Sequence, residues 1–493
     1  MKTLGLFSLL LVCQWAFAQD PTGVVEGQIL DPSNSAVTQA TVMAQNAQTG
    51  FTATQRSAGD GVYHFSSLPV GDYSLRIAAD GFTPFNAAQI HIDINRTVRF
   101  RVRLEIAGGR SEVSVTANGA SVDLGSTLGN VVTSHEATEL PLNGRNFTQL
   151  GLLQPGVAPM TAGLSEAGGL LRSGQAYAVN GQRPESHSYI LDGVANVNSV
   201  DGGFALRTPV DAISEFRILT SNAPAEYGST SGATTSVVTR SGGNELHGSL
   251  YEFLRNNDFD ARNFFASTTE PLHQNQFGAT FGGPIRKNRD FIFGYYEGLR
   301  DRQGETETAI VPTPAERTGD FSGLTDPQSG ASIPLIDYFT GAPVPGGILP
   351  TYMLSPVALK ALNFYPLGNV SPSLYASTQM AANNYDQGGA RFDHYFGNGD
   401  QLFARYAIAS DNSMDPLPID GAGVPGLPVA NSSNTNSLVA SHTHLYSPRT
   451  VQSVKAAFFR NTFLFDERLN HDDRPRWTSS TSRHWVSPPD RRT

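Results

Sequence analysis

Turn-forming residues interrupt this chain of 493 residues so often that long helices have little room to form. Gly (49) and Pro (30) together make up about a sixth of the sequence. Because Pro breaks helix interiors and Gly weakens them, this composition favours short strands joined by turns over a helical bundle or a coiled coil. The length is enough for about three domains. We therefore expect a mainly β protein built from several domains.

The first residues predict export. Lys2 is followed by an apolar run from Leu4 to Phe17 and by Ala16-Phe17-Ala18, which is the order of a secretory signal peptide with cleavage after Ala18. The run is too short to cross a membrane as a helix, and no later apolar run is long enough. An exported chain of this kind is either soluble or a membrane β-barrel. Cleavage after Ala18 would also remove the single cysteine, Cys13, so we expect no disulfide in the mature chain.

Residues 20–105 have the alternation of a small antiparallel β-sandwich. Apolar residues recur at every second position in several short runs separated by turn residues. The predicted core consists of Val25, Ile29, Tyr63, Phe65, Tyr73, Leu75 and Ile77. The string GDGVYHFSSLPVGDYSLRIAADGF (59–82) resembles the carboxypeptidase regulatory-like domain, which is related to Cna-B modules and to carbohydrate-binding-like folds. No zinc ligand set accompanies it, so we interpret His64 and His91 as surface residues of strands.

Residues 106–240 resemble the plug domain of TonB-dependent outer-membrane receptors. The matching strings are LPLNGRNFTQL (140–150), AVNGQRPESHSYILDGVANVN (178–198) and FRILTSNAPAEYGSTSGATTSVVTRSGGNELHGSLYEFLRN (216–256). Within that superfamily they are most similar to the Oar-like group, which carries the same N-terminal sandwich. Asn180-Gly181 is a tight-turn dipeptide, and Leu191-Asp192-Gly193 ends a strand in another turn.

The segment before the plug resembles a TonB box, an extended stretch that pairs with the edge strand of a periplasmic energy-transducing protein of the TonB type. Its candidate residues are Glu112, Val113, Ser114, Val115, Thr116 and Ala117. Alternating side chains and free backbone groups suit strand addition, although an ordinary edge strand has the same pattern. Both interpretations stay open.

Residues 241–470 predict the first part of an antiparallel transmembrane β-barrel. Asn275, Phe277, Ala279 and Phe281 share one face of a strand, and 391–409 has the pattern of a hairpin. The aromatic residues Phe291, Phe293, Tyr295 and Tyr296 would suit a girdle at a membrane interface. A soluble sandwich would show the same alternation, so here the membrane interpretation rests on the resemblance. Between the strands, 300–390 has the composition of a long extracellular loop, with a short helix expected from Ser355-Pro356 to Tyr365.

The length sets a limit on the barrel. A transporter barrel with 22 strands needs well over ~400 residues at about 10 residues per strand plus turns and loops. About 250 residues follow position 243, and the tail 471–493 is basic, rich in Pro and Ser, and unlike a strand. The sequence therefore predicts a truncated or frame-disrupted receptor that cannot close a barrel as written.

No catalytic or cofactor motif has the context that its chemistry requires. Residues 421–426 satisfy G-x-G-x-x-G, but Pro416, Pro418, Pro425 and Pro428 disfavour the strand and the helix that must flank a dinucleotide site. His442 and His444 would share a strand face without a third metal ligand. We expect no enzyme, no cofactor and no metal.

Two functions follow as expectations. The first is a receptor and transporter in the cell outer membrane that takes up a ligand through a gated plug, with a TonB-type protein and outer-membrane lipid as partners and no nucleic acid. Carbohydrate, siderophore and peptide all stay open as ligand classes. The alternative is a non-transporting cell-envelope protein that binds glycan or a periplasmic partner through the sandwich and the plug. The net charge of −10 argues against a nucleic-acid-binding surface over the whole protein.

Overall fold

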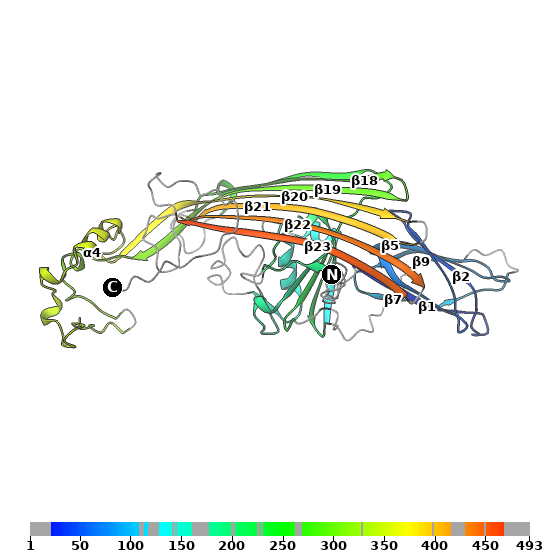
Figure 1. Ribbon diagram of the computed structural model, residues 1–493, viewed down its shortest axis with the longest axis horizontal. Helices are drawn as coiled ribbons and strands as arrows, with labels where there is room; N and C mark the ends of the chain where they lie inside the picture. Colours follow the sequence, from blue (N-terminus) through cyan, green and yellow to red (C-terminus); the bar gives the residue numbers. More distant parts are fainter. Residues whose placement is uncertain are drawn as a thin grey trace, which may run out of the picture. The chain divides into compact units, whose positions relative to one another are not determined.

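The computed structural model shows a mainly β protein (Figure 1). It describes residues 21–467 apart from the segments 108–112, 117–127, 141, 143–144, 160–176, 199–202, 224–226, 228–229, 262–268, 327–328, 397–398, 416–428 and 448–449. The described chain forms two compact units. One contains a β-sandwich, a middle domain and a sheet of long strands, and the other contains residues 307–376. The signal peptide, the 421–426 motif and the tail 471–493 lie outside the described residues.

The N-terminal domain is the predicted β-sandwich. One sheet consists of β4 (Val62–Pro69), β1 (Thr22–Leu30), β7 (Thr97–Arg99) and β8 (Val102–Arg103). The other has the order β3 (Thr52–Arg56), β2 (Thr41–Asn46), β5 (Gly71–Ala78), β6 (Phe85–Ile92) and β9 (Val113–Thr116). All seven predicted core residues are at most 2% exposed. His64 and His91 lie on β4 and β6, as expected.

The described part of the TonB-box candidate forms the last strand of the second sheet. Strand β9 pairs in parallel with β6, so that Phe85 lies opposite Val113 and Ala87 opposite Val115. Because β9 ends the strand order, its other edge has no partner strand among the described residues. Glu112 and Ala117 lie outside the described residues.

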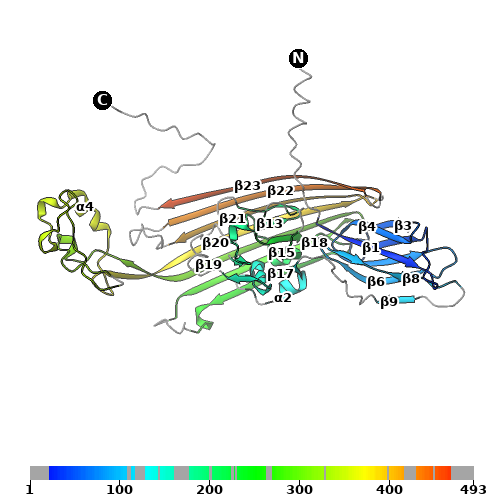
Figure 2. The same ribbon diagram turned by 90° about the horizontal axis from the view of Figure 1, so that it is seen from below.

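The middle domain has its own sheet of five strands (Figure 2). The strand order is β10 (Leu128–Thr133), β15 (Ile213–Ser221), β16 (Thr234–Thr239), β13 (Ser188–Leu191) and β14 (Val194–Ala195). The short helix α2 (Ser134–Glu139) begins with a capping box between Thr133 and Glu136, which satisfies backbone N–H groups at its start. A compact aromatic core contains Phe147, Phe204 and Phe216. The ring centroid of Phe147 lies 5.5 Å from that of Phe204 and 5.6 Å from that of Phe216.

Asp192 and Gly193 form a two-residue turn between β13 and β14. Both have positive φ, 51° and 78°, and Leu191 pairs with Val194 across the turn. Positive φ at both central positions is the geometry that Asp-Gly favours in a hairpin. Asn180 and Gly181, at 50° and 78°, adopt the same backbone geometry after β12 (Tyr177–Val179). Both turns that the sequence predicted are confirmed.

The long strands form one sheet in chain order, seen side by side in Figure 1. They are β17 (His247–Asn256), β18 (Leu272–Arg286), β19 (Asp290–Ile310), β20 (Leu374–Tyr395), β21 (Gln401–Asp415), β22 (Val429–Ser447) and β23 (Thr450–Glu467). Pairing is antiparallel in the registers of β17 with β18, β18 with β19, and β20 with β21. The predicted hairpin 391–409 is confirmed, with Arg391 opposite Arg405. The loop boundaries differ from the expectation, because β19 and β20 extend into 300–390 from both sides.

The second unit is a folded insertion between β19 and β20. Its helix α4 (Pro356–Ala361) begins at the predicted Ser355 cap, whose hydroxyl accepts a hydrogen bond from the Ala358 N–H, and η11 (Leu362–Phe364) continues it. Arg317 donates hydrogen bonds to the carbonyls of Leu362, Tyr365 and Pro366 at 2.6–2.9 Å. The Leu362 carbonyl also accepts the N–H of Tyr365, the C-cap residue of η11, so Arg317 adds donors to carbonyl groups at and just after the helix end. No helix among the described residues has both the length and the apolar character needed to cross a membrane.

Candidate functional site

The long-stranded sheet has a polar inner face. Along β22 every second side chain is buried, and most of these side chains are polar: Ser433, Thr435, Ser437, Ser441 and Thr443 are each at most 8% exposed. On β18, β19 and β20 the buried set includes Gln276, Glu297 and Gln387, and Gln387 donates a hydrogen bond to Glu297 at 2.9 Å. Burying hydroxyls, amides and carboxylates is unfavourable unless they find partners, so this face is built to meet other polar groups.

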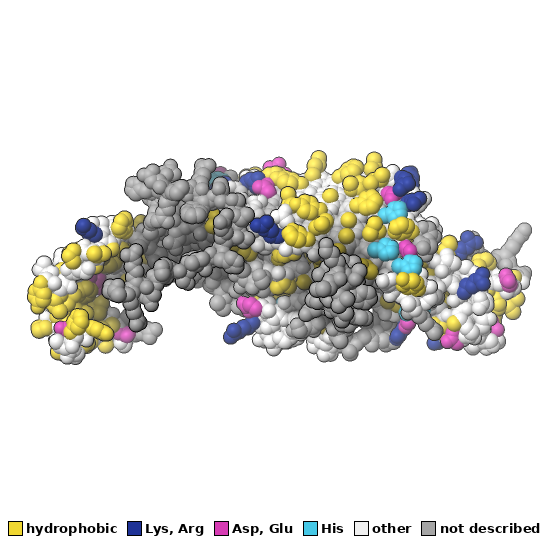
Figure 3. Space-filling model, in the orientation of Figure 1, with side chains coloured by type: hydrophobic (Ala, Val, Ile, Leu, Met, Phe, Trp, Pro, Cys, Tyr) yellow, Lys and Arg dark blue, Asp and Glu magenta, His cyan; other side chains and the backbone are white. Residues whose placement is uncertain are grey.

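The outer face is apolar. Phe281, Ile285, Tyr406, Ile408 and Leu438 are between 46% and 59% exposed. Figure 3 shows hydrophobic side chains gathered over the long strands. A soluble sandwich buries its apolar face and exposes its polar one, whereas a membrane barrel does the reverse. The structure therefore favours a membrane wall over the soluble alternative that the sequence left open.

The predicted aromatic girdle is wrong for three of its four members. Phe291, Phe293 and Tyr295 are at most 8% exposed and face inward, and only Tyr296, at 43%, faces outward. Phe291 joins the sandwich core through Tyr395, and Phe293 and Tyr295 pack with Ala212 of the middle domain. Successive strand residues alternate between the two faces, and an aromatic residue fits either face.

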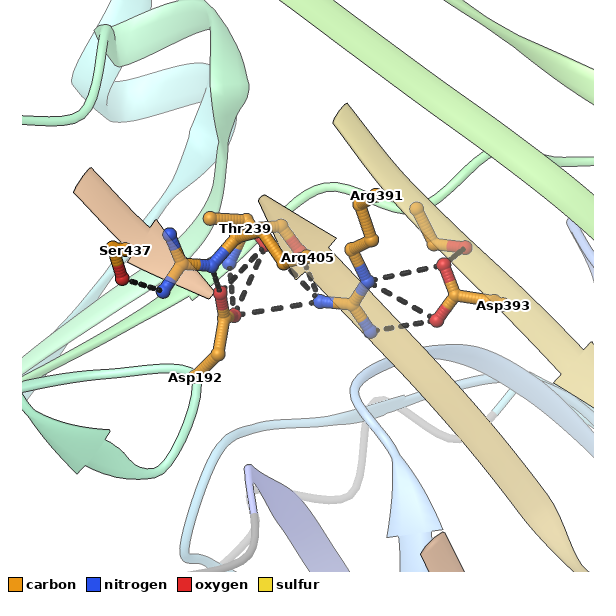
Figure 4. Close-up of polar contacts among 7 residues, drawn as sticks. Asp192, Thr239, Arg391, Asp393, Arg405 and Ser437 are labelled. Atoms are coloured by element: carbon orange, nitrogen blue, oxygen red, sulfur yellow. Dashed lines mark hydrogen bonds and ion pairs between the residues drawn. The ribbon is translucent and has the colours of Figure 1, made fainter. Parts of the chain in front are cut away.

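An ion-pair network joins the middle domain to the inner face of the wall (Figure 4). The Asp192 side chain is fully buried and lies 2.6 Å from Arg405 Nε of β21 and 3.4 Å from Arg391 Nη1 of β20. Thr239 of β16 holds the same carboxylate, donating from its N–H at 2.8 Å and from its hydroxyl at 2.9 Å. The carboxylate thus stands between its own domain and two strands of the wall.

Arg391 links this carboxylate to a second one. Its guanidinium donates to Asp393 at 2.8–3.1 Å and, through Nη1, to the Thr239 carbonyl at 2.9 Å. Asp393 also accepts a hydrogen bond from the Ser241 hydroxyl at 2.8 Å. The Phe403 ring centroid lies 4.6 Å from the Arg391 guanidinium carbon, within reach of a cation–π contact. Two carboxylates therefore balance two buried guanidinium groups.

Arg405 depends on Asp192 more than Arg391 does. It is 1% exposed, and Asp192 is its only ion-pair partner among the residues described. Ser437 accepts one hydrogen bond from it at 3.4 Å, whereas Nε, which forms the ion pair with Asp192, and Nη1 have no hydrogen-bond partner in the described part of the chain. Burying a charge without a counter-charge lowers the stability of the folded chain. Asp192 supplies the negative charge that offsets the burial of Arg405.

Apolar and polar contacts both join the middle domain to the wall. Ala407 and Ala409 of the wall pack against the aromatic core cluster of the middle domain, in addition to the contact of Phe293 and Tyr295 with Ala212, and Thr435 of the wall donates to the Ala205 carbonyl at 3.2 Å. A cavity of about 560 Å³ adjoins the network and is lined by the sandwich loop 46–49, the segment 238–247, Arg391 and Asp393. Water can replace the polar contacts of this interface.

The sandwich contacts the middle domain through a second polar joint. Glu215 of β15 is 1% exposed; its Oε1 lies 2.7 Å from His91 Nε2, and its Oε2 accepts the Ile94 N–H at 2.8 Å. Arg217 donates to the carbonyls of Ile94 and Asn95. The hydrogen bond to Glu215 raises the pKa of His91 to about 9. The ring is therefore protonated at neutral pH and pairs with a buried carboxylate.

The sequence predicted none of these site residues. The sequence predicts Asp192 only as a turn residue. It places Arg391 and Arg405 in a hairpin and predicts no ion-pair partner for either of them. His442 and His444 lie on the same face of β22, as expected, with ring centroids 6.5 Å apart, and His444 pairs with Asp400 at 2.6 Å. A charged residue on the inward face of a wall strand is the signal that could have drawn attention to Arg405.

Comparison with known proteins identifies two domains. Residues 24–105 match the model of the carboxypeptidase regulatory-like domain, and residues 238–482 match that of the outer membrane beta barrel domain. The chain is 28% identical over 314 residues to the TonB-dependent transporter Oar of Myxococcus xanthus, a match that covers 59% of this chain and 28% of that protein. The chain thus spans about a quarter of the length of this relative.

Two solved structures match this chain at low similarity. The outer membrane transporter YddB of Escherichia coli is 11% identical with a TM-score of 0.41, covering 64% of this chain and 37% of that one. The siderophore receptor PirA of Acinetobacter baumannii is 16% identical with a TM-score of 0.34, covering 68% and 48%. Both TM-scores are below 0.5, so the sequence matches carry the assignment. The chain therefore carries a carboxypeptidase regulatory-like domain followed by an outer membrane beta barrel domain, which places it in the cell outer membrane, and in sequence it is similar to the TonB-dependent transporter Oar.

Proposed function

We propose that the chain acts in ligand uptake across the outer membrane and that its middle domain is the plug. The observation that carries this proposal is the Asp192 network, because it holds a separately folded domain to the polar face of a membrane wall by ion pairs. Such ion pairs are strong while water is excluded and every partner is in place, and water can replace them once the plug moves. Carbohydrate, siderophore and peptide are the ligand classes proposed. The domain boundaries 106–240 for the plug and 241–470 for the wall are part of the same proposal.

The proposed energy-coupling partner is a periplasmic TonB-type protein that pairs with residues 112–117. Strand β9 supports this role because one of its edges is unpaired among the described residues and can accept another strand. Its other edge is held by β6 of the sandwich. A pull on β9 would therefore reach the sandwich first, and the joint at Glu215 and Arg217 would pass it to the plug.

We expect Val115→Pro to abolish binding of a TonB-type C-terminal domain to the purified 493-residue chain. Pro removes a backbone donor and fixes φ, and strand addition depends on backbone hydrogen bonds. Ser114→Ala should bind like the unaltered chain, since the backbone is unchanged. Binding is measured by biolayer interferometry with the TonB domain immobilised. Equal binding by Val115→Pro would remove the box from the proposal and favour the alternative, a binding protein of the cell envelope that does not transport.

The membrane orientation of the wall has its own test. Ile408, in the middle of β21, is 47% exposed on the outer face, and Tyr446, near the end of β22, is 63% exposed. Arg at the bilayer midplane costs about 2–4 kcal/mol and near an interface about 0–1 kcal/mol. We therefore expect Ile408→Arg to reduce recovery from the outer-membrane fraction much more than Tyr446→Arg does. Equal recovery of both variants would contradict the assignment of this face to lipid.

A further inference from the structure

Three potential metal ligands converge where the sandwich meets the plug. They are His91 at the end of β6, Asp93 in the turn that follows and Glu215 on β15. One ligand atom from each residue can be chosen so that all three lie within 4.8 Å of one another. We propose that this cluster binds a divalent transition-metal ion of the Zn²⁺ or Mn²⁺ type. Sequence patterns do not predict this cluster, because Glu215 is 124 positions from His91.

The distances suit a small divalent cation after a slight opening of the cluster. Bonds of about 2.0–2.2 Å in a tetrahedral site place neighbouring ligand atoms about 3.4 Å apart. His91 Nε2 lies 3.6 Å from Asp93 Oδ1 and 2.7 Å from Glu215 Oε1. The first distance already fits, and the second must lengthen by several tenths of an ångström. One imidazole nitrogen with two carboxylate oxygens is a donor set that Zn²⁺ and Mn²⁺ accept.

Each ligand residue also makes a polar contact with a group outside the cluster, which fixes its orientation. Asp72 Oδ1 lies 2.7 Å from His91 Nδ1, and because a carboxylate only accepts, Nδ1 carries the hydrogen and Nε2 is the nitrogen that faces the two carboxylates. Metal-binding histidines are usually oriented by a carboxylate in this way. The second oxygen of Glu215 accepts the Ile94 N–H, and that of Asp93 accepts Arg96 Nη1 at 2.9 Å. Glu215 Oε1 and Asp93 Oδ1 are the oxygens that lie near His91 Nε2, at 2.7 and 3.6 Å.

The charges and the exposure of the cluster also favour a cation. The carboxylates of Asp72, Asp93 and Glu215 surround one imidazole, and Arg96 pairs with one of them. A divalent ion would supply positive charge to these carboxylates. The His91 side chain is 41% exposed, so an ion and its remaining water ligands can enter from solvent.

The consequence is a cation-bridged joint between two domains. The sandwich contributes His91 and Asp93, and the plug contributes Glu215, so a bound ion would tie β6 to β15 by direct coordination. This inference does not depend on transport, since it concerns binding to the folded chain.

The test is isothermal titration of the full-length chain in detergent with Zn²⁺ at about pH 8, followed by X-ray absorption spectroscopy of the loaded protein. We expect one equivalent to bind, with nitrogen and oxygen neighbours and no sulfur. Mn²⁺ should bind at the same place. Zn²⁺ should displace the bound Mn²⁺, and electron paramagnetic resonance of Mn²⁺ would follow this exchange. His91→Ala and Asp93→Asn should each weaken binding at least about tenfold, and Asp72→Asn, which removes the group behind the histidine, by about 10–100-fold.

His64→Ala is the matched control. His64 lies on the same sandwich and pairs with a single carboxylate, Glu26, at 3.4 Å, so its removal should leave Zn²⁺ affinity unchanged. His91 and Asp93 both lie at the edge of the joint and are not part of the sandwich core, so their variants should fold. Absence of saturable Zn²⁺ binding, or equal affinity in His91→Ala and the unaltered chain, would overturn the proposal.

Discussion

Replacing Asp192 by Asn is expected to destabilise the chain by about 3–5 kcal/mol, the cost of leaving a buried charge without its partner. Arg405 is the charge concerned, since it is 1% exposed and has no other ion-pair partner among the described residues. Arg391 is less affected because it keeps Asp393. The free energy of unfolding is measured by guanidinium titration of the detergent-solubilised chain. Hydrogen exchange reports whether β13 and β16 lose protection first.

A second substitution separates this effect from simple disruption of the turn. Asp192→Asn combined with Arg405→Gln removes both charges and should recover a large part of the lost stability. Glu26→Gln is the control for an exposed ion pair, Glu26 with Arg99, and should cost only about 0.2–1 kcal/mol. If the double variant is no more stable than Asp192→Asn alone, the ion pair is not what holds the plug to the wall.

Tyr73→Ala is expected to destabilise the sandwich by about 3–5 kcal/mol, as large aromatic truncations in cores do. Tyr73 lies on β5 and is 2% exposed, surrounded by the core residues of both sheets. Its hydroxyl donates a hydrogen bond to the Pro69 carbonyl at 2.9 Å. Loss of the ring leaves a cavity in the core between the two sheets. The measurement is hydrogen exchange of β1, β2 and β5 in the full-length chain.

Tyr73→Phe is the matched control, because it keeps the ring and removes only the hydroxyl. We expect a loss of about 0.5–1.5 kcal/mol, the usual net contribution of one hydrogen bond. The full chain is needed for this comparison, since Tyr395 of the wall lies 5.0 Å from Phe51 of the sandwich between ring centroids. Equal protection of the strands in Tyr73→Ala and Tyr73→Phe would show that the ring does not support the core.

Local patterns in the sequence were sufficient to predict local structure. The alternation of Tyr73, Leu75 and Ile77 predicted β5 and its buried face, because a strand places every second side chain on one side. Asp192-Gly193 predicted a hairpin turn, because these two residues tolerate positive φ. The Ser355-Pro356 pair predicted a helix start for an equally local reason. In each case the determining interactions lie within a few residues of one another.

The tertiary structure decided which face of each strand meets the middle domain and which side chains meet across domains. Nothing in the run from Phe291 to Tyr296 tells inward from outward, since aromatic residues fit both a membrane-facing surface and a packed interior. Asp192 and Arg391 are 199 positions apart, and Glu215 and His91 are 124 apart. Contacts over such separations depend on how separately folded domains pack together. The sequence alone therefore predicts strands, turns and a resemblance to known domains, whereas the ion network and the proposed metal site exist only because folding brings charged side chains together that are distant in the chain.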